Sequence, residues 1–548
     1  MLQALFIIAG TMVASVSFAF AQFSSFTNLI PGFGSGSSNI TVPAAPTSTA
    51  STTPVVAPTA TGTPSTTPAV PVAKVTTTLD YSKPYTSVHS GPAVVKKEAF
   101  GTVYTTFNTL PNYKKAVEQV PNQSIRWPGG SFAERTGPDR LYDLTFPDIY
   151  KEPAPGEAGY SANNQKGLTD VMAYAVEKNL PFVMVIPTEP YFNNVANGQA
   201  HLREFMIKLV RGDYGPLPTS ITLEIGNENA HVGWVNGKFT PGPGSYGFVT
   251  NAFLTTINSV LNDVKLNPQK KRVDVAIWIG STEGGMPNIY KQISAANMKT
   301  VDGFVHHIGL VANINEYDFA TTNRKFGVAK SYWNAAFGGR NVPEMRLIAT
   351  EWNVGNCDKP TSPAGYLRYD VGARQAPTVV NNFSQMIGGG LDVGMLWGNQ
   401  TCISQMLWHS GETISHGGHA FRLMAESLTG TQLLAGKVNS RGFWTRTGTN
   451  YDVIGYRDNT KMVVFISAGD IPASGLDVTV SLTNFGTIKS ITTESVKTTL
   501  SQPGDPSPDD DRIYEEAVIS KGTLTPTGNS FTYRLTEDYE LARVIINR

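Results

Sequence analysis

The sequence lacks a surplus of either charge, a set of cysteines and more than one long apolar run. Its 43 basic residues balance 43 acidic residues within 548 positions, so no broad positive field attracts nucleic acid or an anionic bilayer. Its two cysteines, Cys357 and Cys402, are too few to define a disulfide framework. These absences favour a neutral partner and predict that the protein does not bind nucleic acid.

The long apolar run is the N-terminal segment, residues 1–21. It is uncharged and ends in Ala19-Phe20-Ala21, which fits a signal-peptidase site, although the positively charged start of a typical signal peptide is missing. A membrane anchor is the alternative, but the run is short and polar residues interrupt it. No later stretch approaches the roughly 18 consecutive apolar residues of a membrane span. We therefore expect the mature protein to be secreted, extracellular and outside the membrane.

Residues 22–78 are expected to form a disordered linker. From Ser35 to about Thr78 the segment consists mainly of Ser, Thr, Pro, Ala and Val, with no charge before Lys74. Such a composition buries too little surface to offset the entropy lost on ordering. Residues 79–98 read as one or more strands, which either join a C-terminal sandwich or remain separate from it.

Residues 99–430 alternate between short apolar runs and helical patterns. Strands are predicted at 101–107, 122–127, 181–187, 221–226, 272–280, 302–308, 345–351 and 391–397. Helices are predicted at 113–119, 168–176, 200–210, 246–264, 288–296, 325–336, 371–387 and 418–429. This alternation indicates a parallel sheet with crossover helices, and eight units predict closure into a (β/α)8 TIM barrel.

The helical pattern stops after Gly430, and short alternating runs take over. Strands are predicted at 453–456, 462–467, 476–482, 488–493 and 542–546. This pattern is typical of an antiparallel β-sandwich. The predicted fold class is therefore α/β, with a catalytic barrel over 99–430 and an accessory sandwich over 431–548.

Two glutamates mark the chemistry of the predicted barrel. Glu228 directly follows the fourth strand, and Glu351 ends the seventh. The carboxyl ends of the strands form one face of such a barrel, so side chains far apart in the sequence can meet there. Alone, each glutamate fits a helix cap or an ion pair. Together they predict a glycosidase pair, in which one carboxyl protonates the departing oxygen and the other attacks the sugar or activates water.

Three short segments carry a resemblance to known enzymes. They are residues 125–130 (Ile-Arg-Trp-Pro-Gly-Gly), 224–229 (Glu-Ile-Gly-Asn-Glu-Asn) and 350–353 (Thr-Glu-Trp-Asn). Together they resemble the retaining glycoside hydrolases of clan A, the 4/7 superfamily. The pattern is most like the family 51 α-L-arabinofuranosidases, with families 39 and 79 as relatives. The resemblance covers the predicted barrel, and a trailing β-sandwich also suits these families.

The resemblance implies a role for each residue of the motifs. Glu228 would be the general acid/base, which requires a raised pKa, and Glu351 the ionised nucleophile. Arg126 would lie against the nucleophile, and Asn227 would bind the 2-hydroxyl of the sugar. His307 would lie near the nucleophile, but Ile308 and Gly309 follow it where the family has aromatic residues. This departure weakens the expectation of a tyrosine contact.

Further substrate contacts are predicted around the pair. Trp397 ends the eighth strand and offers an apolar face to a sugar ring. Trp352 and Tyr191 lie at other strand ends, where each of them either contacts the sugar or belongs to the core. Glu189 and Glu134 follow the third and second strands. Each of them either binds a substrate hydroxyl or caps a helix.

No metal and no cofactor are expected. His409, His416 and His419 have no neighbouring cysteine and fit no common ligand spacing. Cys357 and Cys402 follow neighbouring strands of the predicted barrel, so they either form a disulfide at its rim or remain two separate thiols.

We therefore predict a secreted retaining glycoside hydrolase acting on a polysaccharide or oligosaccharide, arabinofuranosidase-like or related. Two alternatives remain. One is an endo-acting glycanase of the glucanase, mannanase or xylanase type. The other is a barrel that binds carbohydrate without cleaving it.

Overall fold

The computed structural model describes the C-terminal unit of the chain, Ala69–Arg548, in part. The described residues are 71–87, 91–103, 121–128, 133–134, 168–228, 234–235, 238–239, 245–279, 286–308, 319–339, 342–353, 373, 375–397, 414–434, 450–469, 471–498 and 517–548. Several predicted features lie outside them, namely the signal peptide, the linker up to residue 70, the helix at 113–119, Gly309, His409 and both cysteines.

Eight parallel strands close into a barrel, as predicted. They are β4 (Gly101–Val103), β5 (Ser124–Trp127), β6 (Phe182–Ile186), β7 (Ile221–Ile225), β10 (Asp274–Trp278), β11 (Gly303–Ile308), β12 (Arg346–Trp352) and β13 (Val393–Leu396). Each strand pairs in parallel with the next, and β13 returns to β4. Neighbouring carboxyl ends therefore share one face of the barrel.

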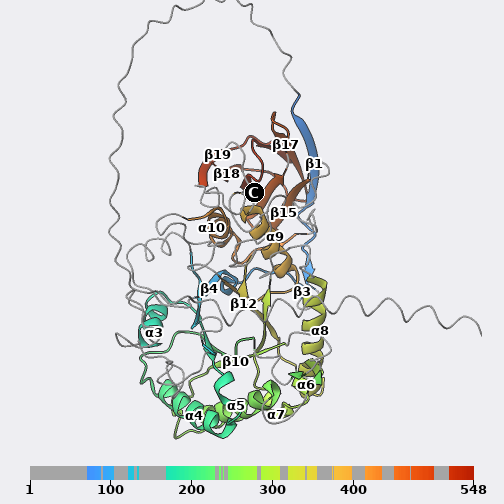
Figure 1. Cartoon of the computed structure of the whole chain (residues 1–548). Coiled ribbons are helices and arrows are strands. Elements are labelled where there is room, and N and C mark those ends of the chain that lie inside the picture. Colours follow the sequence, from blue (N-terminus) through green and yellow to red (C-terminus); the bar gives the residue numbers. More distant parts are fainter. Residues whose placement is uncertain are drawn as a thin grey trace, which may run out of the picture. The chain divides into compact units, whose positions relative to one another are not determined.

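Helices connect the strands on the outside of this barrel (Figure 1). They are α3 (Leu168–Glu177), α4 (Val195–Arg211), α5 (Tyr246–Leu261), α6 (Met286–Tyr290), α7 (Ala295–Met298), α8 (Phe319–Ala336), α9 (Gln375–Gly388) and α10 (His416–Leu428). Local chemistry sets their ends. The side chain of Asn194 caps α4 by accepting the N–H of Asn197, and Gly212 ends that helix at a φ of 89°.

The single helix expected at 288–296 is wrong, because two short helices occupy this stretch. Ser294 has an extended backbone, and its side chain accepts the N–H of Asn297 to begin α7. Serine favours this N-cap geometry over a place inside a helix. Among the described residues, none of the helices combines the length and hydropathy of a membrane span.

The antiparallel sandwich has two sheets. The larger has the order β14 (Gln432–Leu433), β15 (Asn450–Arg457), β16 (Lys461–Gly469), β21 (Leu541–Asn547), β18 (Ser490–Thr498) and β19 (Ala517–Thr523). The smaller has the order β1 (Ala73–Asp80), β17 (Leu476–Thr483) and β20 (Ser530–Leu535). Strands β14, β19 and β20 were not predicted.

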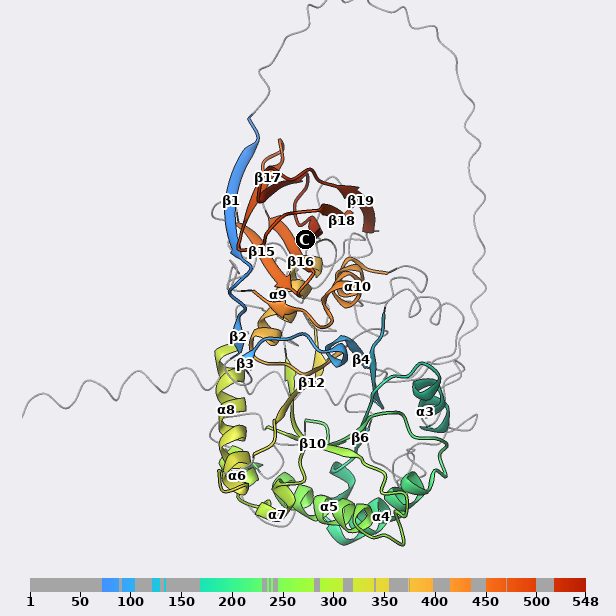
Figure 2. The same cartoon turned by 180° about the vertical axis from the view of Figure 1, so that it is seen from behind.

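Strand β1 comes from the other end of the chain and runs parallel to β17 (Figure 2). The expected linker reached residue 78, but residues 73–78 belong to this strand. Leu79 is fully buried, and Val75 packs against the same apolar cluster as Val478. The linker prediction is therefore wrong for residues 73–78, because alternate side chains of this Thr-rich segment cover the sandwich core.

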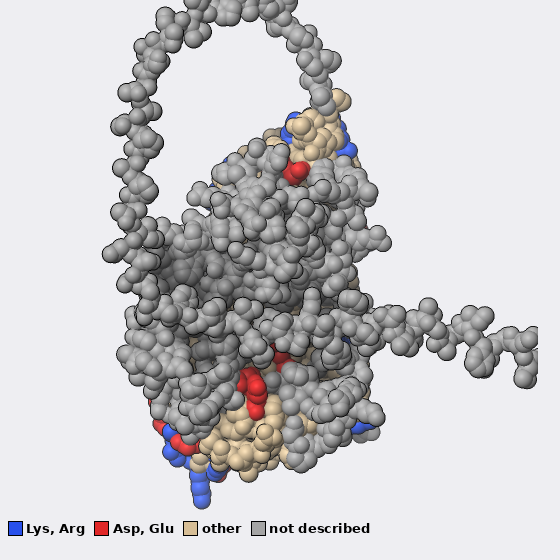
Figure 3. Space-filling view, viewed as in Figure 1, with Lys and Arg blue, Asp and Glu red and all other residues tan. Residues whose placement is uncertain are grey.

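Helices α9 and α10 pack against the larger sheet of the sandwich. Asn381 of α9 donates to Asp452 over 3.0 Å, and Arg422 of α10 pairs with Glu494 at 2.7 Å. On the described part of the face in Figure 3, basic and acidic residues are both scattered, and neither sign forms a broad patch. This agrees with the zero net charge of the sequence.

Candidate active site

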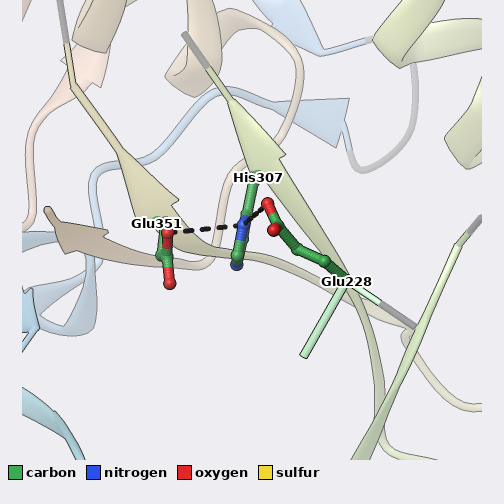
Figure 4. A group of neighbouring side chains, drawn as sticks. All are labelled: Glu228, His307 and Glu351. Carbon is green, nitrogen blue, oxygen red and sulfur yellow. Dashed lines mark hydrogen bonds and ion pairs between the residues drawn. The ribbon is translucent and has the colours of Figure 1, made fainter. Parts of the chain in front are cut away.

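The carboxyl ends of three strands bring Glu228, His307 and Glu351 together (Figure 4). The imidazole Nδ1 of His307 lies 2.8 Å from Oε1 of Glu228 and 3.5 Å from Oε2 of Glu351. One carboxylate oxygen from each glutamate and one ring nitrogen all lie within 4.8 Å of one another. The two glutamates singled out in the sequence thus face one another, with His307 between them.

The two carboxylates have different surroundings. The side chain of Glu351 is 5% exposed, whereas that of Glu228 is 51% exposed. Burial raises the pKa of Glu351 above its ordinary value, while His307 and Arg126 oppose the rise by stabilising the charged form. One carboxylate therefore lies in the protein interior beside a cation, and the other reaches solvent.

Arg126 is the cation beside Glu351 and is fully buried at the end of β5. Its Nη1 donates to Glu351 over 2.6 Å. Its Nε and Nη2 donate to the two oxygens of Glu224 over 2.7 and 2.9 Å. Burial disfavours the charge of Arg126, but Glu224 and Glu351 outweigh burial and hold its pKa above the usual range. Arg126 is thus a fixed positive charge behind the inner carboxylate.

Glu224 was not predicted as a site residue, although it lies within the motif at 224–229. It is fully buried in β7 and also accepts a hydrogen bond from Thr350 over 3.0 Å. A charged residue within an apolar strand is the signal that sequence reasoning missed, because such a residue is rarely buried unless it is paired.

The segment that carries Glu228 is held in an unusual backbone conformation. Gly226 has a φ of 75° and Glu228 a φ of 57°. A Cβ at position 226 would lie 2.7 Å from Oγ1 of Thr188, so only glycine fits there. A positive φ is costly for glutamate and persists only where the surroundings fix it. Here the side chain of Asn227 is also fixed, because its Oδ1 accepts a bond from Arg126 over 2.8 Å.

Trp278 supports both the histidine and the backbone of this segment. Its ring meets that of His307 edge-on, with centroids 4.4 Å apart, and its Nε1 donates to the carbonyl of Gly226 over 2.8 Å. No motif or spacing distinguishes Trp278 from the other seven tryptophans of the sequence.

Two predicted sugar-binding aromatics are core residues instead. Trp352 is fully buried and packs against Phe383 of α9 and Phe421 of α10. Successive side chains of a strand point to opposite faces, so Trp352 must point outward where Glu351 points into the barrel. Tyr191 is also buried, since it packs against Phe253 of α5. Neither ring has a face exposed to a substrate.

The other predicted contacts lie at or near the strand ends. Trp397 directly follows β13 and is partly buried, and its carbonyl accepts a bond from Asn353 over 2.6 Å. Glu189 is exposed in a 3-10 helix, η3 (Glu189–Tyr191), which follows β6. Ile308 is buried after His307, so this position offers no aromatic contact.

Glu228, His307 and Glu351 are also residue types that bind metal ions. The guanidinium of Arg126, 2.6 Å from Glu351, opposes a dication at this place. Away from this site, His416 contacts the carbonyl of Lys497, and burial lowers the pKa of His419 to about 4. The absence of a metal therefore remains a prediction, and this charge distribution supports it.

The models of known protein families and the sequences of curated proteins give no match to this chain. Solved structures do match. A family 51 arabinofuranosidase from Xanthomonas axonopodis pv. citri has a TM-score of 0.53 at 14% identity, covering 86% of this chain and 100% of that one. A family 51 α-L-arabinofuranosidase from Bifidobacterium longum has a TM-score of 0.54 at 12% identity, covering 86% and 99%. A family 44 xyloglucanase from Paenibacillus polymyxa has a TM-score of 0.51 at 9% identity, covering 87% and 100%. The chain therefore shares the fold of these enzymes, a (β/α)8 barrel with a β-sandwich, as predicted.

Proposed function

We propose that this protein is a secreted retaining glycoside hydrolase that uses Glu351 as nucleophile and Glu228 as general acid/base. The observation that carries the proposal is the approach of the two carboxylates, with oxygens within 4.8 Å of one another. Retaining enzymes place their two carboxyl groups about 5–5.5 Å apart, whereas inverting enzymes leave about 6.5–9.5 Å for a water molecule. The separation supports double displacement.

In the first step, an oxygen of Glu351 attacks the anomeric carbon while the glycosidic C–O bond breaks. Glu228 gives its proton to the departing oxygen, and a glycosyl ester forms on Glu351. In the second step, Glu228 takes a proton from water, the water oxygen bonds to the anomeric carbon, and the ester C–O bond breaks. Both glutamates return to their starting states, and one water molecule has been consumed.

The unequal surroundings of the two glutamates support this division of roles. Glu351 lies against Arg126, whose charge favours the ionised form that a nucleophile needs. Glu228 is half exposed and can exchange its proton with a leaving group and then with water. His307 contacts both groups and fixes their relative orientation. Asn227, held through its Oδ1 by Arg126, would direct its amide N–H2 to the 2-hydroxyl of the sugar.

The substrate is proposed to be a neutral glycan carrying terminal arabinofuranose or a related sugar, because arabinofuranosidases are among the structural neighbours. Endo-acting cleavage of a polysaccharide backbone is the second candidate, and the likeness to a xyloglucanase favours it. A time course of products separates the two, because removal of terminal arabinofuranose releases monosaccharide from the start, whereas cleavage inside the backbone first releases larger fragments.

The test uses the secreted full-length protein on a panel of aryl glycosides and of plant, fungal and algal polysaccharides. Glu351→Gln should lower turnover by at least about 10³-fold while leaving the protein folded. Glu344→Gln is the matched control, because Glu344 is exposed on the loop before the same strand. NMR should show that the first product keeps the anomeric configuration of the substrate. An inverted product, or full activity of the Glu351 variant, would refute the proposal.

A further inference from the structure

Glu134 is a buried carboxylate that the proposed mechanism does not use. It follows β5, is 2% exposed and contacts two neighbouring strand ends. Its Oε2 accepts the backbone N–H groups of Thr188 and Glu189 over 2.7 and 2.8 Å. Its Oε1 accepts the backbone N–H of Asn227 over 2.7 Å. The side chain thus ties the end of β6 to the residue directly before Glu228.

The bond to Asn227 completes a set that fixes the backbone in front of Glu228. The carbonyl of Ile225 accepts from the hydroxyl of Tyr246 over 2.6 Å. The N–H of Gly226 donates to the carbonyl of Ile186 over 2.8 Å, and its carbonyl accepts from Trp278 over 2.8 Å. The four successive backbone polar groups from the carbonyl of Ile225 to the N–H of Asn227 are therefore all hydrogen-bonded. Glu134 is the only side chain that accepts a bond from them.

We propose that Glu134 is a positioning residue for the general acid/base, acting through the backbone of Asn227 to hold Glu228 in its positive-φ conformation. The inference rests on the proposed function. Without Glu134, the N–H of Asn227 would be buried without its acceptor, and this segment would relax to satisfy it. Glu228 would then move away from the leaving group. Glu351 on β12 would stay bonded to Arg126 on β5.

Glu134→Gln is the appropriate change because glutamine has the size of glutamate but the wrong pattern of donors. Both oxygens of Glu134 accept backbone N–H groups. A carboxamide has one acceptor oxygen and one N–H2 group, so in either orientation a donor faces a donor. Burial raises the pKa of Glu134, but the three N–H donors oppose this rise, and bonds to both oxygens fit the ionised form.

The experiment compares two aryl glycosides of the same sugar. Arabinofuranosides are tested first, and if they are not cleaved, the glycosides of whichever sugar the panel identifies are used. The 2,4-dinitrophenyl glycoside needs almost no protonation of its leaving group, whereas the phenyl glycoside depends on the general acid. For Glu134→Gln we expect kcat/KM to fall on the order of 10²-fold with the phenyl glycoside. With the dinitrophenyl glycoside we expect a fall of less than about fivefold, because the nucleophile is undisturbed.

The ratio of the two kcat/KM values does not depend on the concentration of folded enzyme, so it remains informative when part of a variant preparation is misfolded. Glu134→Asp is the second variant, because it keeps the charge but shortens the reach, and it should change the ratio in the same direction. Asp392→Asn is the matched control. Asp392 is also a buried carboxylate that accepts a backbone N–H, that of Leu347, but at the opposite end of the barrel.

The control should leave the ratio of the two substrates at its wild-type value, even where it lowers stability. Equal losses on both substrates in both Glu134 variants would overturn the positioning role, because they would mean a general structural effect. Failure of the wild-type protein to cleave any glycoside would instead refute the proposed function itself. Wild-type activity that depends on Glu351, with an unchanged ratio in the Glu134 variants, would refute this inference alone.

Discussion

Replacing Arg126 by methionine should destabilise the protein strongly at neutral pH and much less in acid. The guanidinium is fully buried and makes two hydrogen bonds to Glu224, one to Glu351 and one to Asn227. Methionine fills much of the same space without a charge. Two buried carboxylates then lose their shared cation, and breaking a buried pair in this way costs about 3–5 kcal/mol.

The sign of the pH dependence follows from the same contacts. Without Arg126, which opposes the effect of burial in the wild type, burial holds the pKa of Glu351 in the folded variant further above its unfolded value. A group with a raised folded pKa contributes stability below its unfolded pKa and loses that contribution as the pH rises. The stability gap between wild type and Arg126→Met should therefore be widest near pH 7 and narrow below about pH 5.

Urea unfolding of both proteins between pH 4 and pH 8 measures this gap. Arg272→Met is the matched control, because Arg272 also pairs with two carboxylates, Asp274 and Asp302, but its side chain is 81% exposed. Exposed pairs contribute about 0–1 kcal/mol. A loss below about 1 kcal/mol for Arg126→Met, or a gap that does not change with pH, would contradict the assignment of Arg126 as the charge that holds the inner carboxylates.

Two further predictions concern the same face of the barrel. Burial raises the pKa of Glu351, so kcat/KM should fall in acid with a midpoint above pH 4.5, the ordinary pKa of glutamate. A midpoint below pH 4.5 would contradict the role of burial. Gly226→Ala should lower both stability, by more than about 1 kcal/mol, and kcat, because a Cβ would lie 2.7 Å from Thr188 at a φ of 75°. Gly212→Ala, at the end of α4 with a φ of 89°, should cost stability alone, and an equal loss of kcat in both variants would count against a local effect.

The strands of the barrel were predictable because each is a short apolar run that both faces of a parallel sheet must bury. Seven residues were expected for the first strand, 101–107, and the structure describes three, Gly101–Val103. The approach of Glu228 and Glu351 was predictable for a related reason. The carboxyl ends of parallel strands share one face, so knowing the strand of Glu228 and of Glu351 was enough to predict that they meet.

Other features left no clear signal in the sequence. The partners of Glu134 are backbone N–H groups, which every residue has, so no spacing of side chains identifies them. Trp352 was selected because it lies at a strand end, but a strand end alone does not fix the direction of a side chain, and neighbours in a strand face opposite ways. Strand β19 was missed because most of its side chains are exposed, which removes the alternation that marks a half-buried strand.

The pairing of β1 with β17 delays completion of the smaller sheet until long after β1 has been synthesised. Ala73 lies opposite Leu476, so about 400 residues are added between the two partners. At roughly 5–20 residues per second, the earlier strand waits on the order of 20–80 s for its neighbour. A chain shortened before residue 476 would keep every barrel strand yet leave Ala73–Asp80 with no edge to join, exposing an apolar stripe to aggregation.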